Sequence, residues 1–198
     1  MKQDCRSLVG MLAIGLLALA PAFAQSSQGA GQSQAKTAGQ SNSDAKNNSN
    51  SANRMGADNG FVTKAANGGL AEVKLGTLAT QKAASADVKA FGQQMVDDHG
   101  KANDELKQLA SSKGITLPTN VDAKEQAKYD RLSKLSGAEF DRSYMKEMVS
   151  DHHTDVAEFR RESQSGSDSD VKAWAAKTLP TLEHHLQMAE STDAKVKK

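Results

Sequence analysis

Apolar residues recur every three or four positions through most of the chain after residue 58, whereas the segment before it lacks this pattern. Such spacing places side chains on one face of a helix and predicts amphipathic helices wherever it persists. The pattern predicts four long helices at about 59–84, 86–112, 137–164 and 168–190. A short helix is predicted between the second and third, from Asp122 to about Leu135.

Residues at the predicted helix ends are those that favour helix initiation and termination. Ser85 stands where the second helix needs an N-cap, and Gly114 follows its last turn. The spacing Asp122-x-x-Glu125 is a capping box for the short helix, and a second box begins at Ser136. Short links within the first and last pairs of long helices favour antiparallel neighbours. The sequence therefore predicts an all-α, antiparallel four-helix bundle at 58–192, followed by a basic tail at 193–198.

Residues 1–24 have the pattern of a secretory signal peptide. Lys2 and Arg6 precede an apolar run at 8–20, which is too short to span a bilayer, since a span needs about 20 apolar residues. Small residues around Phe23 favour cleavage after Ala24. We therefore expect an exported, periplasmic protein with no transmembrane span after signal removal.

The segment 25–57 consists mainly of Gln, Ser, Asn, Gly, Ala and Lys. This composition buries too little apolar surface to offset the entropy of ordering and predicts a disordered linker. The single cysteine, Cys5, lies within the signal peptide, so neither a disulfide nor a thiolate ligand is expected in the mature chain. Signal removal would leave 23 basic and 23 acidic residues, a balance that gives no indication of nucleic-acid binding.

Helical wheels place one ionisable side chain at or beside the apolar face of each long helix, with two aspartates near them. These residues are the candidate metal ligands, in chain order Glu72, Asp98, His99, His152, Asp155 and His185. Glu72, His99 and His152 lie near the midpoints of their predicted helices. We therefore expect these three residues at the same height along the bundle axis. His185 is about five residues past the midpoint of its predicted helix, which corresponds to a displacement of about 7.5 Å.

Two interpretations of these inward side chains remain open. Burying them without partners would cost several kcal/mol, so they either form a hydrogen-bond network or hold a metal ion. Imidazole and carboxylate ligands together suit Zn, Fe or Mn. Pairs such as Met95 with His99 and Met148 with His152 add thioethers, which suit Cu, although methionine also fills cores.

Four segments, each containing one of these residues, carry a resemblance to a known family. They are AANGGLAEVKLGTLA (65–79), FGQQMVDDHGKANDELKQLA (91–110), YMKEMVSDHHTDVAEFRRES (144–163) and TLPTLEHHLQMA (178–189). The chain resembles a family of exported bacterial proteins of unknown function, whose members are often labelled "predicted outer membrane protein" or "putative membrane protein". This resemblance implies a ferritin-like bundle associated with the cell envelope.

The histidine motifs depart from the ferritin-like di-iron pattern, which requires Glu three residues before a histidine on two helices. Val96 and Leu182 stand at those positions before His99 and His185. No nucleophile elbow or phosphate-binding loop is present either. We expect a non-enzymatic envelope bundle with a metal-binding or stress-protective role. The alternatives are a metal-dependent oxidoreductase using iron or copper and a purely structural envelope protein.

Overall fold

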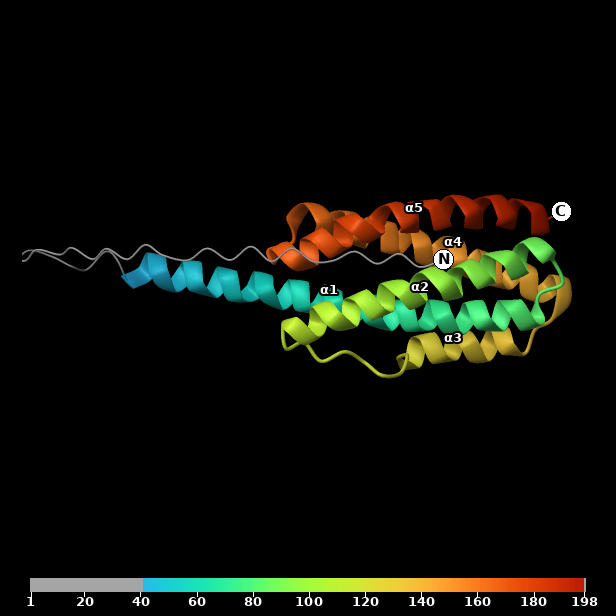
Figure 1. Ribbon diagram of the computed structural model, residues 1–198, viewed down its shortest axis with the longest axis horizontal. Coiled ribbons are helices and arrows are strands. Elements are labelled where there is room, and N and C mark those ends of the chain that lie inside the picture. The colour runs from blue at the N-terminus through green and yellow to red at the C-terminus, as the bar shows by residue number, and fades with distance from the viewer. Residues whose placement is uncertain (1–40, 198) are drawn as a thin grey trace, which may run out of the picture. The chain divides into compact units, whose positions relative to one another are not determined.

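The computed structural model describes the backbone of residues 41–197 and the side chains of residues 55–197 (Figure 1). This region contains helices and no strand. The helices are α1 (Ser41–Lys82), α2 (Ala86–Ser112), α3 (Ala123–Ser133), α4 (Gly137–Ser165) and α5 (Ser169–Val196). The predicted signal peptide and residues 25–40 of the predicted linker lie outside the described residues. None of the described helices is long and apolar enough to cross a membrane.

Helices α2, α3 and α4 occur close to their predicted positions, and their ends show why. Gly114 has a φ of 67°, which lets Ile115 N–H donate to the carbonyl of Ala110 over 2.9 Å after α2 ends. The Asp122 carboxylate accepts from the backbone N–H of Glu125 over 2.9 Å, so this predicted cap is confirmed. Ser136, by contrast, makes no side-chain capping bond to α4.

The first and last helices extend past the predicted bounds of the bundle. Helix α1 begins at Ser41 and so includes residues 41–57 of the segment predicted to be disordered. A helix can propagate through residues without an apolar stripe once a nucleus exists, because each added residue gains a backbone hydrogen bond. At the other end, α5 continues to Val196, and Thr192 and Asp193 are buried, so the predicted basic tail is mostly helix.

The helices associate as two pairs, α1 with α2 and α4 with α5. Contacts of α2 with α5 and of α1 with α4 join the pairs, while α3 lies against α1 and α4 (Figure 1). A Cβ atom on Gly76 would lie 2.5 Å from the carbonyl oxygen of Gly92. Helices α1 and α2 therefore touch at their backbones, which only glycine permits at this distance.

Each pair caps the turn of the other with a buried aspartate. Asp141 of α4 accepts from the backbone N–H groups of Ala84 and Ser85, in the turn between α1 and α2. Asp58 of α1 accepts from the N–H groups at 167 and 168, in the turn between α4 and α5. These reciprocal bonds fix the relative position of the two pairs along the bundle axis.

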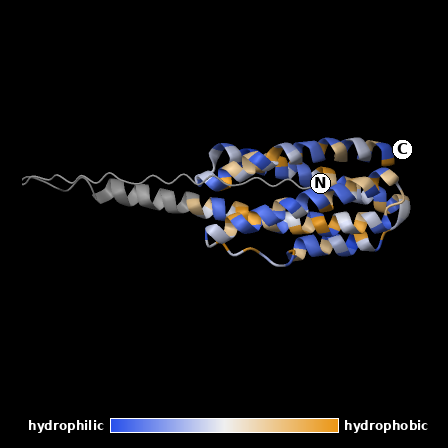
Figure 2. Cartoon of the chain, viewed as in Figure 1, coloured by the Kyte–Doolittle hydropathy of each residue, from blue (hydrophilic) through white to orange (hydrophobic). Residues whose placement is uncertain are grey.

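Two apolar clusters fill the interior, and a polar layer separates them. One cluster includes Leu75, Phe91, Met95, Phe140 and Met148. The other includes Phe61, Val62, Leu106, Phe159 and Trp174. Figure 2 shows hydrophobic and hydrophilic residues alternating along every long helix. Each of these helices passes from one cluster to the other through a buried polar residue: Glu72, His99, His152 and His185.

Candidate metal centre

Three histidines from three helices meet in the polar layer. His99 lies on α2, His152 on α4 and His185 on α5, and each is buried, with at most 7% of its surface exposed. The ring centroids are 5.8 Å apart for His99 and His152, 5.3 Å for His99 and His185, and 5.4 Å for His152 and His185. Each ring offers a nitrogen within 4.8 Å of the nitrogens of the other two.

Hydrogen bonds at the outer edges of two rings fix their tautomers. The Nδ1 of His152 lies 2.9 Å from the carbonyl oxygen of Met148, which can only accept, so this nitrogen carries the proton. The Nε2 of His185 lies 2.8 Å from the Asp98 carboxylate. Burial opposes ionisation of Asp98, but hydrogen bonds from Gln94 and His185 outweigh it and lower the pKa of that carboxyl. His185 therefore also donates outward.

Three of the four remaining ring nitrogens are buried without a hydrogen-bond partner. They are Nε2 of His99, Nε2 of His152 and Nδ1 of His185, all inaccessible to solvent. The tautomers leave a lone pair on Nε2 of His152 and on Nδ1 of His185. A proton on Nε2 of His99 could be donated to only one of these two lone pairs. Unpaired buried polar atoms cost about 1–3 kcal/mol each, which makes this arrangement unfavourable without a further bound group. The predicted hydrogen-bond network among the inward side chains is thus incomplete at its centre.

Burial keeps the three imidazoles neutral. It lowers the pKa of His99 well below its ordinary value, and charges on His152 and His185 would lower it further. Burial also lowers the pKa of His152 and of His185, despite opposing effects of nearby aspartates. Neutral imidazole is the form that binds metal ions, so no proton has to be removed from these side chains near pH 7.

The donor set fits a transition-metal ion. Zinc binds imidazole nitrogen at about 2.0–2.1 Å, which in tetrahedral geometry separates the ligand nitrogens by about 3.4 Å. One nitrogen of each ring now lies within 4.8 Å of the nitrogens of the other two. To bind the ion, the rings would therefore have to move closer to one another by at most about 1.4 Å. Three protein ligands would leave a fourth position open. The outward bonds to Asp98 and Met148 are those that orient histidine ligands in metal sites.

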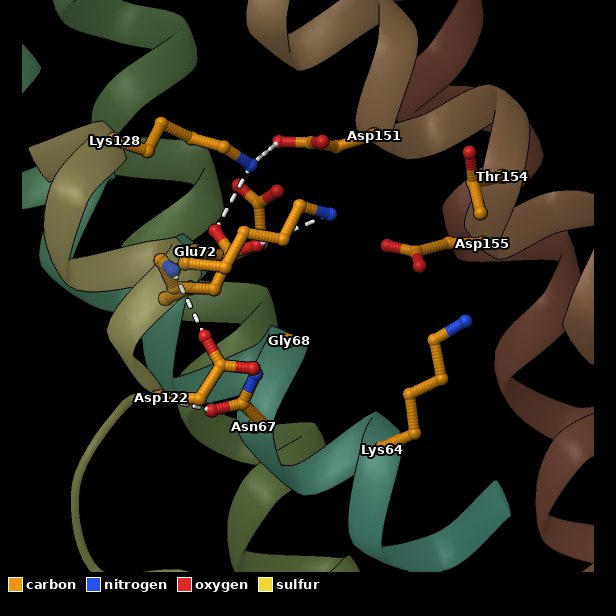
Figure 3. Close-up of a pocket in the computed structure, with 12 residues that line it drawn as sticks. Lys64, Asn67, Gly68, Glu72, Asp122, Lys128, Asp151, Thr154 and Asp155 are labelled. Atoms are coloured by element: carbon orange, nitrogen blue, oxygen red, sulfur yellow. Dashed lines mark hydrogen bonds and ion pairs between the residues drawn. The ribbon is translucent and has the colours of Figure 1, made fainter. Parts of the chain in front are cut away.

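The six predicted residues do not form one cluster. His99, His152 and His185 come together, and Asp98 contacts only His185 from outside. The predicted displacement of His185 was wrong, because α5 is longer than predicted and His185 lies near its middle. Glu72 and Asp155 line a neighbouring pocket bounded by α1, α3 and α4 (Figure 3).

Glu72 and Asp155 occupy an environment that disfavours their charged forms. Burial, followed by the charge of Asp151, raises the pKa of Glu72 to about 8. Burial, followed by the charge of Glu72, raises the pKa of Asp155 to about 7. These two carboxyl groups therefore differ from Asp98, which is stabilised as an anion by its hydrogen bonds.

Lys128 and Tyr144 belong to this region but were not predicted from the sequence. Lys128 of α3 is buried and bridges Asp151 over 2.6 Å and Glu125 over 2.9 Å. The Tyr144 hydroxyl is buried without a partner, and burial together with the charge of Glu72 raises its pKa. The spacing of Lys128 three residues after Glu125 was the available signal, but its meaning depends on how α3 packs.

Comparison with known proteins places the chain in a family. Residues 23–192 match the family described as "Domain of unknown function (DUF4142)", and the chain belongs to it. A solved structure, "Crystal structure of DUF305 fragment from Deinococcus radiodurans", is similar to this fold with a TM-score of 0.62. The two are 12% identical, and the alignment covers 70% of this chain and 95% of that one. A comparison with curated proteins gave no match.

Proposed function

We propose that this protein binds one transition-metal ion through His99, His152 and His185. The observation that supports this proposal is that the three rings each offer a nitrogen within 4.8 Å of the other two, and that each ring also has a buried nitrogen without a hydrogen-bond partner. Two of them are lone-pair acceptors fixed by outward hydrogen bonds. A metal cation would satisfy all three nitrogens at once, whereas any arrangement of protons leaves at least one unpaired.

The proposed setting of this activity rests on the sequence alone. We propose that the protein is exported by the signal at 1–24 and acts in the periplasm or in association with the envelope, in a metal-binding or stress-protective role. The bundle would be an antiparallel, ferritin-like arrangement of α1, α2, α4 and α5, with α3 as an addition. The resemblance of the histidine segments and the similarity to the DUF305 fold support this assignment.

Zinc and copper fit the three histidines better than manganese does, since imidazole ligands suit Zn, Cu and Fe whereas carboxylates suit Mn. Met95 and Met148 belong to an apolar cluster, which accounts for their burial by packing. Copper nevertheless remains a specific alternative to zinc, because both methionines lie one helical turn before a histidine ligand.

A metal-dependent oxidoreductase is the second candidate function. The observation in its favour is a cavity of about 30 Å³ lined by His99, one of the three proposed ligands. Such a volume holds a water molecule or a species of similar size, and no organic substrate. Any reaction at this centre would therefore use a small molecule such as oxygen.

The decisive experiment compares inward and outward histidines. The metal-free protein is offered Zn²⁺, Mn²⁺, Fe²⁺ and Cu⁺ separately, and bound metal and thermal stability are measured. Wild type should bind one ion, and at a hundredfold excess over Kd the folded state should gain about 2.7 kcal/mol. The double variant His152→Ala/His185→Ala should lose both the ion and the gain.

The chain supplies its own control for this experiment. His153 and His184 are the sequence neighbours of two ligands, and both are exposed. The variant His153→Ala/His184→Ala removes the same number of imidazoles and should bind metal as wild type does. Equal loss in both variants would indicate surface binding and refute the proposed centre. Oxygen consumption with bound iron or copper would favour the oxidoreductase, and absence of any binding would favour the structural role.

A further inference from the structure

The pocket between α1, α3 and α4 has a volume of about 250 Å³ and contains a carboxylate that is nearly inaccessible to solvent. Glu72 is 4% exposed, and its Oε2 atom has no hydrogen-bond partner. Asp155 extends into the same pocket from α4 (Figure 3). Two carboxylates thus face a solvent-connected space from two different helices.

The lysines of this pocket are engaged with other acidic groups. Lys128 pairs with Asp151 and Glu125, Lys64 pairs with Glu158, and Lys124 lies 3.9 Å from Glu125. Neither Glu72 nor Asp155 forms an ion pair with any residue in the described part of the chain. Lys128 offsets only part of the cost of charging Glu72, and a cation bound between the two carboxyl groups would offset more of it.

The pocket adjoins the histidine centre at one point. Gly68 and Asp155 line the pocket, and they also line the cavity of about 30 Å³ that reaches His99. A Cβ atom built on Gly68 would meet no heavy atom within 4 Å. The absence of a side chain at residue 68 therefore leaves space where the two cavities meet.

We propose that Glu72 and Asp155 form a loading site, at which a divalent metal cation binds before it passes Gly68 to reach the three histidines. This inference rests on the proposed function, because it assigns an access route to that centre. The volume of the inner cavity restricts the passing species to an ion with about one water, and so excludes an organic amine as the ligand.

The first test uses the nearly isosteric variant Glu72→Gln/Asp155→Asn and Co²⁺, whose absorption reports binding by the histidines. Loading in stopped flow at about pH 9, above the pKa of both carboxyl groups, should slow by about tenfold or more, since clefts of complementary charge raise association rates by about 10–10³. Release to a chelator should slow by a similar factor, because the same route serves both directions. The equilibrium Kd should change by less than about threefold. An access route changes the rates of binding and release, but it does not change the free-energy difference between the metal-free and the metal-bound protein.

A second test blocks the passage with a side chain. Gly68→Leu should slow loading, whereas Gly60→Leu should not. Gly60 lies on the same helix, also has no heavy atom near its Cβ position, and lines neither cavity. Both substitutions replace glycine by a better helix former, so neither should unfold α1.

The outcomes separate the two proposals. Wild-type rates in both the carboxylate variant and Gly68→Leu, with Co²⁺ bound to the histidines, would overturn the loading site and leave the metal centre intact. A lower affinity with an unchanged association rate would make Glu72 or Asp155 a direct ligand, and would also overturn the route. If wild type takes up no Co²⁺ at the histidines, the proposed function fails and this inference fails with it.

Discussion

The two apolar clusters and the polar layer between them are built from the same four helices but differ in how well their groups are satisfied. The clusters contain fully buried side chains such as Phe91, Phe140 and Leu106, packed against other apolar residues. Eight buried side-chain atoms lack hydrogen-bond partners among the described residues. Four of these atoms belong to the layer residues Glu72, His99, His152 and His185.

This difference indicates a division of tasks. Burial of apolar surface at both ends stabilises the bundle, at about 25 cal/mol per Å² removed from water. The layer works against that stability when no cation is bound, since lone pairs and carboxyl groups are buried without partners. A protein can retain such a layer when the rest of its interior offsets the cost, and the unpaired atoms are then available to bind a ligand.

The largest effect expected from this contrast is a pH dependence caused by Glu72. Its pKa is about 8 in the folded protein and 4.5 ordinarily. The folded state therefore holds a proton that the unfolded state releases, and the metal-free protein loses stability as pH rises between these values. The full loss corresponds to about 4–5 kcal/mol. Glu72→Gln should remove this loss, so its unfolding free energy in urea should exceed that of wild type at pH 9 and match it near pH 4.

A surface carboxylate provides the control for this measurement. Glu105 is partly exposed and pairs with Lys177. Glu105→Gln should shift the unfolding free energy by less than about 1 kcal/mol at either pH, as surface ion pairs contribute little. If the difference between Glu72→Gln and wild type were independent of pH, then Glu72 would not be the group whose burial opposes folding.

A somewhat smaller loss is expected from the apolar clusters, and it should not depend on metal. Phe140 lies in one cluster and is fully buried, while Phe159 lies in the other. Replacement of either by Ala should cost about 3–5 kcal/mol through lost burial and an unfilled cavity. Urea unfolding with and without Zn²⁺ should show the same metal-induced gain in both variants as in wild type. Loss of that gain would mean that the clusters and the layer are not independent.

Local periodicity predicted the part of this arrangement that depends on single helices. The 3.6-residue repeat identified each long helix and correctly placed Glu72, His99, His152 and His185 inside. Their sequence neighbours His153 and His184 are exposed. Such information is contained within one helix, because a side chain's direction follows from its position along the repeat.

Features that depend on how one helix is positioned against another could not be predicted from the periodicity of a single helix. The level of His185 was wrong because α5 continues to Val196, six residues beyond the predicted end at Glu190. The separation of Glu72 from the histidines depends on α3, which brings Lys128 against that side of the bundle. The helical residues 41–57 have no amphipathic pattern from which a helix could be inferred.

The smallest effect concerns the outer edge of the layer, where the polar groups are satisfied. Asp97 and Asp98 are adjacent, and each accepts a hydrogen bond from the glutamine four residues before it, but only Asp98 reaches His185. Asp98→Ala should free the His185 ring and its tautomer, and weaken metal binding by about 10–100-fold, the usual cost of losing such a partner. Asp97→Ala removes an equivalent carboxylate and should bind metal as wild type does, as measured by competition with a chelator of known affinity. Equal affinities of the two variants would show that the bond to Asp98 does not orient His185. The layer would then hold its metal through the three rings alone, with their orientation set by the packing of the apolar clusters on either side.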